Sequence, residues 1–105
     1  MSQVTSSMAR ARALERVREI ACQVLTGHDA RVYLFGSSAR GQTRRWSDID
    51  VAIDPLRPLP SALLTTLRER LEESAVPYDV DVIDLSKASP AIRARVEQEG
   101  LLWKG

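Results

Sequence analysis

The sequence contains few of the residues that build disulfides or zinc sites, with one cysteine and one histidine among 105 residues. Cys22 alone cannot form an internal disulfide, so we expect a reducing, cytoplasmic location. His28 follows Gly27 at the end of a helical pattern and has no companion histidine or cysteine. We therefore interpret His28 as a surface residue of a turn rather than as a metal ligand.

Long hydrophobic runs and an excess of charge of either sign are also absent. No apolar run is long enough to cross a membrane, and the N-terminus lacks the apolar core of a signal peptide. Fifteen basic and fourteen acidic residues give a net charge of +1, whereas a general nucleic-acid binder is usually clearly basic. We expect no membrane partner and no strong general binding of nucleic acids.

The sequence does contain a regular succession of helix and strand patterns, and its length predicts one domain over residues 1–105. Apolar residues spaced three and four apart predict a helix within residues 1–30: Met8, Ala11, Leu14, Val17, Ala21 and Val24 or Leu25. Ser6 or Ser7 is the expected cap of this helix, and Gly27 is its expected end.

The rest of the chain carries three strand patterns and two helix patterns. We expect strands at residues 31–35, 49–54 and 78–85, and a helix from about residue 60 or 61 to residue 74. Ser89-Pro90 is a typical N-cap and first position of a last helix, and Gly100 is its expected end. The apolar tail at residues 101–103 is either a short edge strand or a partner contact. This order predicts a mixed α/β (α+β) fold, a small mixed sheet packed against helices.

A Gly36-Ser37 turn directly follows the first strand pattern. Gly36 allows a tight backbone turn, and the free N–H groups of a helical turn that begins at Ser37 and Ser38 suit a phosphate. The Ser37 hydroxyl adds a hydrogen bond, and Arg40 or Arg44 adds a positive charge. The turn therefore predicts a site for the phosphates of a nucleotide.

Ten residues after this turn, Asp48-Ile49-Asp50 opens the second strand pattern. Asp48 and Asp50 are two residues apart on a strand, so their side chains share one face, roughly 6–7 Å apart. Asp81, in the third strand pattern, adds another carboxylate. Mg²⁺ prefers carboxylate oxygens, and two such ions hold the attacking and leaving oxygens of an in-line displacement. The pattern predicts metal-assisted nucleotide transfer, with Asp48, Asp50 and Asp81 as its metal-binding and catalytic residues.

Two segments together resemble a known family: Phe35-Gly36-Ser37-Ser38-Ala39-Arg40-Gly41 and Ser47-Asp48-Ile49-Asp50-Val51. They are similar to the minimal nucleotidyltransferases, the smallest members of the DNA polymerase β-like nucleotidyltransferase superfamily. The resemblance runs from about Arg31 to Leu102, and it implies a polymerase β-like palm fold with a catalytic core over residues 31–102. The family's third carboxylate falls on Asp81, with Asp79 the less favoured choice.

The resemblance also carries expectations about substrate and partner. It implies ATP as the nucleotide substrate and two bound Mg²⁺ ions. Family members of this type are typically antitoxins paired with a helical HEPN-domain toxin, and a second protein would complete the site of so short a chain. The resemblance therefore implies AMP transfer to a tyrosine hydroxyl of that toxin. Two alternative functions stay open: a non-catalytic module that neutralises its partner by contact, and an antibiotic-type, small-molecule nucleotidyltransferase subunit. A homo-oligomer also stays open.

Other charged and aromatic residues receive a structural interpretation. Asp54 is expected to end the second strand before Pro55, and Asp79 and Asp84 are expected to be solvated charges at strand ends. Trp103 is interpreted as a core residue. The arginines of the first helix are interpreted as its solvated face: Arg10, Arg12, Arg16 and Arg18.

Overall fold

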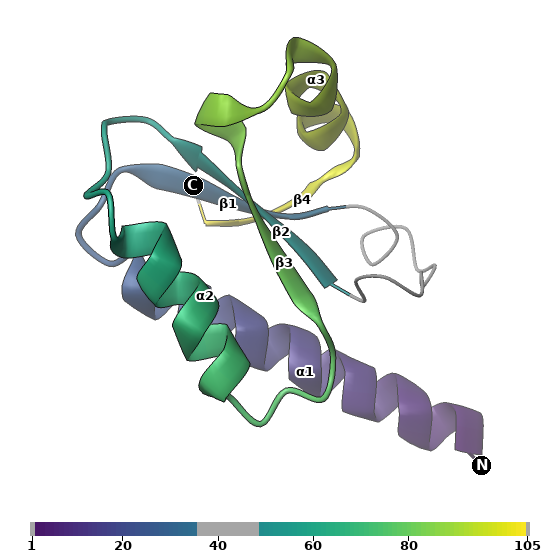
Figure 1. Ribbon diagram of the computed structural model, residues 1–105. Helices are drawn as coiled ribbons and strands as arrows, with labels where there is room; N and C mark the ends of the chain where they lie inside the picture. The colour runs from purple at the N-terminus through teal and green to yellow at the C-terminus, as the bar shows by residue number, and fades with distance from the viewer. Residues whose placement is uncertain (1, 36–48, 105) are drawn as a thin grey trace.

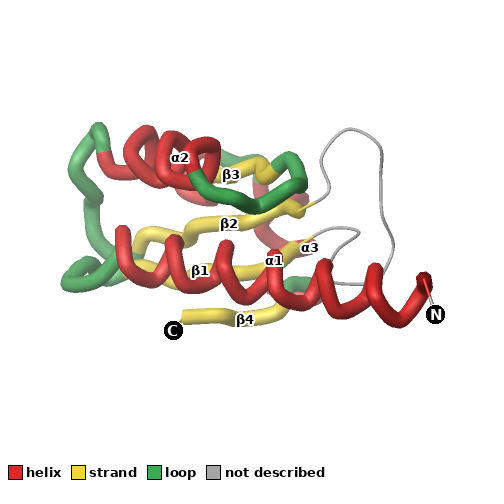
Figure 2. The backbone as a smooth tube through the Cα atoms, turned by 90° about the horizontal axis from the view of Figure 1, so that it is seen from below, coloured by secondary structure: helices red, strands yellow, loops and turns green. Residues whose placement is uncertain are grey.

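The computed structural model describes residues 2–35 and 49–104. Its elements are α1 (Ser2–Val24), β1 (Ala30–Phe35), β2 (Ile49–Pro55), α2 (Leu63–Glu73), β3 (Val80–Asp84), the 3₁₀ turn η1 (Leu85–Lys87), α3 (Pro90–Glu99) and β4 (Leu101–Lys104). Figure 1 shows one sheet with α1 and α2 on one face and α3 on the other. Figure 2, from below, shows α1 and α2 side by side against that sheet.

The four strands form a mixed sheet in the order β3-β2-β1-β4. Strand β1 runs antiparallel to both β2 and β4, whereas β2 and β3 are parallel. A parallel pair needs a crossover connection, and α2 provides it between β2 and β3. The predicted fold class, a small mixed sheet packed against helices, is therefore confirmed.

The main core lies between the sheet and the helices α1 and α2. Alternate strand residues point into it, because successive side chains of a strand face opposite sides. The buried members are Val17, Ile20, Ala21, Leu25, Ala30, Val32, Leu34, Ile49, Val51, Ile53, Leu67, Leu71 and Val82. Trp103 is partly buried and packs against this core, in agreement with its interpretation as a core residue.

A smaller core lies on the opposite face of the sheet, under α3. It consists of Tyr33, Ala52, Leu85 and Val96, with Phe35, Ile83 and Ala88 packed against it. Residues of β2 at even positions therefore face α3, and those at odd positions face α1 and α2. This division decides which carboxylates of the sheet share a face.

The N-terminal helix differs from its prediction at both its start and its buried face. Helix α1 already begins at Ser2, so Ser6 and Ser7 lie within it and the predicted cap is wrong. Met8 and Ala11 are exposed, whereas Ala13 and Ile20 are buried. Among residues 8–24 of this helix, the first buried side chain is therefore that of Ala13. Gly27 follows the helix with a φ of +83°, a backbone conformation that favours glycine.

The boundaries of the other elements agree closely with prediction. Strand β3 is shorter than the expected 78–85, and α2 begins at Leu63, after the segment that contains Pro58 and Pro60. The Ser89 hydroxyl accepts a hydrogen bond from the Ile92 N–H at 3.3 Å and caps α3 as predicted. The apolar tail forms β4, an edge strand paired with β1, which confirms the first of its two interpretations.

Candidate functional site

Asp50 and Asp81 are the two predicted site residues that fall within the described part of the chain. They occupy the same register position on the parallel strands β2 and β3. Ala52 and Ile83, two residues further along each strand, belong to the core under α3. Both carboxylates therefore project on the face that α3 covers, from strands that lie roughly 4.8 Å apart.

The two carboxylates differ in exposure. Asp50 is partly buried, and Asp81, on the edge strand β3, is exposed. Two carboxylates side by side, one of them open to solvent, provide the hard oxygen ligands that suit Mg²⁺, an ion that keeps several of its waters. Within residues 2–35 and 49–104, no group of three or more acidic, histidine or cysteine side chains is arranged to hold a metal ion. The remaining predicted site residues lie outside the described residues: Gly36, Ser37, Ser38, Arg40 and Asp48.

Phe35 and Arg95 border the two carboxylates on the side of β1. Phe35 is the register partner of Asp50 on β1, so Phe35, Asp50 and Asp81 form one row across three strands. The guanidinium carbon of Arg95, on α3, lies 5.9 Å from the centre of the Phe35 ring, within the range of a cation–π contact. The row therefore ends, on its β1 side, at a positive charge.

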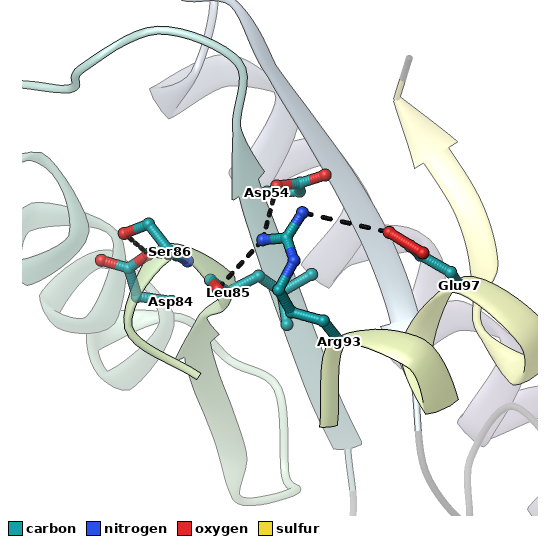
Figure 3. Close-up of polar contacts among 6 residues, drawn as sticks. All are labelled: Asp54, Asp84, Leu85, Ser86, Arg93 and Glu97. Atoms are coloured by element: carbon teal, nitrogen blue, oxygen red, sulfur yellow. Dashed lines mark hydrogen bonds and ion pairs between the residues drawn. The ribbon is translucent and has the colours of Figure 1, made fainter. Parts of the chain in front are cut away.

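Asp54 does more than end a strand, and the prediction for it is wrong. Strand β2 continues through Pro55, and Asp54 is only 5% exposed. Its Oδ1 lies 3.3 Å from Nη1 of Arg93, and the same nitrogen donates to the Leu85 carbonyl oxygen at 3.1 Å. Figure 3 shows the Arg93 guanidinium between Asp54, Leu85 and the more distant carboxylate of Glu97. This contact ties α3 to β2 and η1, because a buried carboxylate requires a partner.

Nothing in the sequence indicated that Arg93 would reach a buried carboxylate or that Arg95 would lie beside the paired carboxylates. Both are followed four residues later by a glutamate, Glu97 and Glu99, which is the usual pattern of ion pairs on an exposed helix. Only the packing of α3 against the sheet separates their roles. Arg93 reaches inward to a buried carboxylate, and Arg95 reaches the ring at the end of β1.

The two strand-end aspartates behave differently. Asp79 is exposed, as predicted. Asp84 is partly buried, and its Oδ1 accepts hydrogen bonds from the Ser86 N–H at 2.9 Å and the Ser86 hydroxyl at 2.6 Å. Asp84 therefore caps η1, as Figure 3 shows, and the prediction of a merely solvated charge is wrong for it.

The arginines of α1 are mostly surface residues. Arg16 and Arg18 form ion pairs with glutamates three residues away, at 3.6 and 4.0 Å, with side chains about half exposed. Arg12 is also exposed. The guanidinium carbon of Arg10 lies 5.2 Å from the centre of the Tyr78 ring. The predicted solvated face holds for three of these residues, and Arg10 contacts the segment that leads into β3.

Two hollows in the surface lie apart from the paired carboxylates. One, of about 730 Å³, lies beyond the carboxyl ends of β2 and β3 and is lined by Pro55 to Ser61, Leu64, Thr65, Arg68, Asp84, Ser86 and Lys87. Another, of about 280 Å³, lies beside the start of β3 and is lined by Leu71, Glu72 and Val76 to Val80. Neither contains Asp50 or Asp81, so we place the candidate site by its chemistry rather than by cavity size.

Across residues 2–35 and 49–104, no helix has both the length and the apolar character needed to span a bilayer.

Comparison with known proteins relates this geometry to a family. Residues 27–103 match the family model described as polymerase beta, nucleotidyltransferase. The protein adenylyltransferase MntA of Shewanella oneidensis is 38% identical over 73 residues, which cover 69% of this chain and 52% of that relative. The chain spans about half the length of the curated relatives it matches.

Solved structures show the same likeness. A chain in the crystal structure of a toxin–antitoxin with AMP-PNP has a TM-score of 0.64 and 30% identity, covering 84% of this chain and 73% of that one. A chain in the structure of the tri-AMPylated Shewanella oneidensis HEPN toxin in complex with an MNT antitoxin has a TM-score of 0.64 and 26% identity. That match covers 90% of this chain and 71% of the other.

Proposed function

Because this chain belongs to the polymerase beta nucleotidyltransferase family, we propose that it transfers AMP from ATP to a hydroxyl group of a partner protein. The observation that carries the proposal is the pairing of Asp50 and Asp81 at one register position on one face of the sheet. Two adjacent carboxylates on neighbouring strands repel each other when no cation lies between them. Together they are suited to binding a cation, and that cation can in turn bind a nucleotide phosphate.

In this proposal the carboxylates and the Gly-Ser turn divide the work. Asp48, Asp50 and Asp81 would hold Mg²⁺, with two ions expected, and the bound ions would supply charge neutralisation for the phosphates and orientation of the reacting oxygens. The second group of residues binds the terminal phosphates of ATP: Gly36, Ser37, Ser38 and Arg40. Most of the rate acceleration then comes from positioning and charge stabilisation, as in other phosphoryl transfers.

Asp81 has the exposure that an acceptor-binding residue needs. Its carboxylate lies on the edge strand and is open to solvent, where a second protein can approach. We assign it to accept a hydrogen bond from the acceptor hydroxyl and to take its proton. The hydroxyl oxygen then bonds to the α-phosphorus, the bond from that phosphorus to the bridging oxygen breaks, and pyrophosphate leaves.

The proposed acceptor is a tyrosine of a helical HEPN-type toxin, which would give this chain the role of an antitoxin. This part rests on likeness, since similar chains are named as protein adenylyltransferases and occur in complexes with HEPN toxins, one of them AMPylated. The use of ATP agrees with a cytoplasmic location. Residues 31–102 would form the catalytic core, with the helix within residues 1–30 as part of the same single domain.

The test is co-expression with a HEPN-type toxin, followed by intact-mass spectrometry of that toxin. Transfer of AMP adds about 329 Da for each modified hydroxyl. Asp81→Asn keeps the size of the side chain but removes its charge, so it should abolish the mass increase and the neutralisation of the toxin while binding persists. Asp79→Asn, at an exposed neighbouring position, is the matched control and should retain both.

The competing outcome is equally clear. If the Asp81→Asn chain neutralises its partner fully and the partner shows no mass increase with either chain, the catalytic proposal is wrong. Inhibition by contact alone would then explain neutralisation.

A further inference from the structure

The ion pair of Arg95 contributes too little to the stability of the fold to explain where its guanidinium lies. Its side chain is 56% exposed, and its ion pair with Glu99 is long, at 3.8 Å. Exposed pairs of this kind contribute little to stability. Yet the guanidinium is not simply extended into solvent, because it lies over the ring of Phe35.

The helix that carries Arg95 is held firmly on the face of the sheet that bears the carboxylates. Val96, the next residue, is fully buried in the core under α3. Arg93, one half-turn earlier, binds the buried Asp54 and the Leu85 carbonyl. The backbone of Arg95 is thus fixed on both sides, while its side chain keeps the freedom to contact a ligand.

The order of the strands shows on which side of the paired carboxylates the Arg95 charge lies. Phe35, Asp50 and Asp81 lie in one row on β1, β2 and β3, and each step between strands is roughly 4.8 Å. In the proposed function the acceptor hydroxyl approaches at Asp81. In an in-line displacement the leaving group departs on the side opposite the attacking oxygen. Pyrophosphate must then point toward β1, where Arg95 lies over Phe35.

We propose that Arg95 binds the β- and γ-phosphates of the nucleoside triphosphate and stabilises the departing pyrophosphate. This inference rests on the proposed function and adds to it a phosphate-binding residue from α3. The planar guanidinium matches phosphate oxygens with paired hydrogen bonds, and its charge is permanent. The ring of Phe35 supports the guanidinium from one side and leaves its N–H groups at the edge for the phosphates.

The test is titration calorimetry of the full chain in the presence of Mg²⁺ with three ligands: AMP-PNP, pyrophosphate and AMP. Arg95→Ala should weaken the binding of AMP-PNP and of pyrophosphate by about tenfold or more, the loss expected for a hydrogen bond to a charged group. The affinity for AMP should not change. Arg16→Ala is the matched control, because Arg16 is similarly exposed and forms a similar ion pair on α1. It should leave all three affinities unchanged.

Two results would overturn the inference while the proposed function stands. One is unchanged AMP-PNP affinity in Arg95→Ala, and the other is an equal loss for AMP, which would put Arg95 at the nucleoside end. If the wild-type chain binds no AMP-PNP, the proposed function fails and the inference with it. Thermal melting checks that each variant folds. Should Arg95→Ala fail to fold, Arg95→Lys is the alternative variant. It keeps the positive charge but lacks the paired N–H groups of the planar guanidinium, and it should still lose affinity for pyrophosphate.

Discussion

Asp50 and Asp81 are direct register partners on two parallel strands, and their carboxylates share one face of the sheet. Two unit charges about 5 Å apart repel by about 0.8 kcal/mol in water and by about 3 kcal/mol at an effective dielectric constant of 20. In the proposed function, a bound divalent cation would convert this repulsion into attraction.

The first prediction is that Mg²⁺ stabilises the folded chain through this pair. A ligand that binds only the folded state raises stability by about 2.7 kcal/mol at one hundred times its dissociation constant. Thermal melting of the wild-type chain should therefore shift upward with Mg²⁺. Asp81→Asn should melt near the wild type without metal, because the residue is exposed, and should lose most of the upward shift.

Asp29→Asn is the control for this measurement. Asp29 is also an exposed carboxylate, but it pairs with Arg57 at 2.9 Å, away from the paired carboxylates. Its variant should keep the full Mg²⁺ shift. A shift that persists in Asp81→Asn would show that the ion binds elsewhere, and Asp81 would lose its place among the proposed ligands.

The second prediction concerns the buried contact between Asp54 and Arg93. Arg93→Ala leaves a carboxylate that is only 5% exposed without this partner, and an unsatisfied buried charged group is expensive. We expect a loss of about 2–3 kcal/mol in the free energy of unfolding, less than for a fully buried pair because the Arg93 side chain is 38% exposed. Urea denaturation measures it.

Two further variants separate the ion pair from the packing of the helix. Adding Asp54→Asn to Arg93→Ala removes the buried charge that has lost its partner, and it should recover part of the loss in unfolding free energy. Arg95→Ala, on the same helix, should change the stability by less than about 0.5 kcal/mol. Equal losses in Arg93→Ala and Arg95→Ala would show that the contact with Asp54 is not what anchors α3.

The third prediction concerns Gly100, where α3 passes into β4. A Cβ at this position would lie 2.5 Å from the Val96 carbonyl oxygen and 3.3 Å from two side-chain carbons of Tyr33. The Val96 oxygen cannot move easily, since it accepts the Gly100 N–H at 2.8 Å. Gly100→Ala should therefore cost about 1–3 kcal/mol, the range for overpacking. Gln98→Ala, at an exposed position of α3, should be nearly neutral, and a similarly neutral Gly100→Ala would show that the junction adjusts.

The local chemistry of the sequence determined most of the elements and their faces. Alternation of apolar residues marked the strands, and Ser89-Pro90 marked the start of α3, because period and capping depend only on neighbours along the chain. The spacing of the Gly-Ser turn and the two aspartates indicated the family, which comparison confirmed. The same parity by itself places Asp50 on the face opposite Ile49 and Val51.

Tertiary structure alone decided which residues meet. A strand pattern fixes the face of a side chain but not its neighbouring strand or register, since these depend on contacts distant in sequence. Pairing of β2 with β3 therefore placed Asp81 beside Asp50, and docking of α3 buried Asp54 against Arg93 and brought Arg95 to Phe35. An arginine followed four residues later by a glutamate is a common pattern on solvated helices, so this pattern does not distinguish Arg93 from Arg95. Only packing gives two such arginines on one helix different partners.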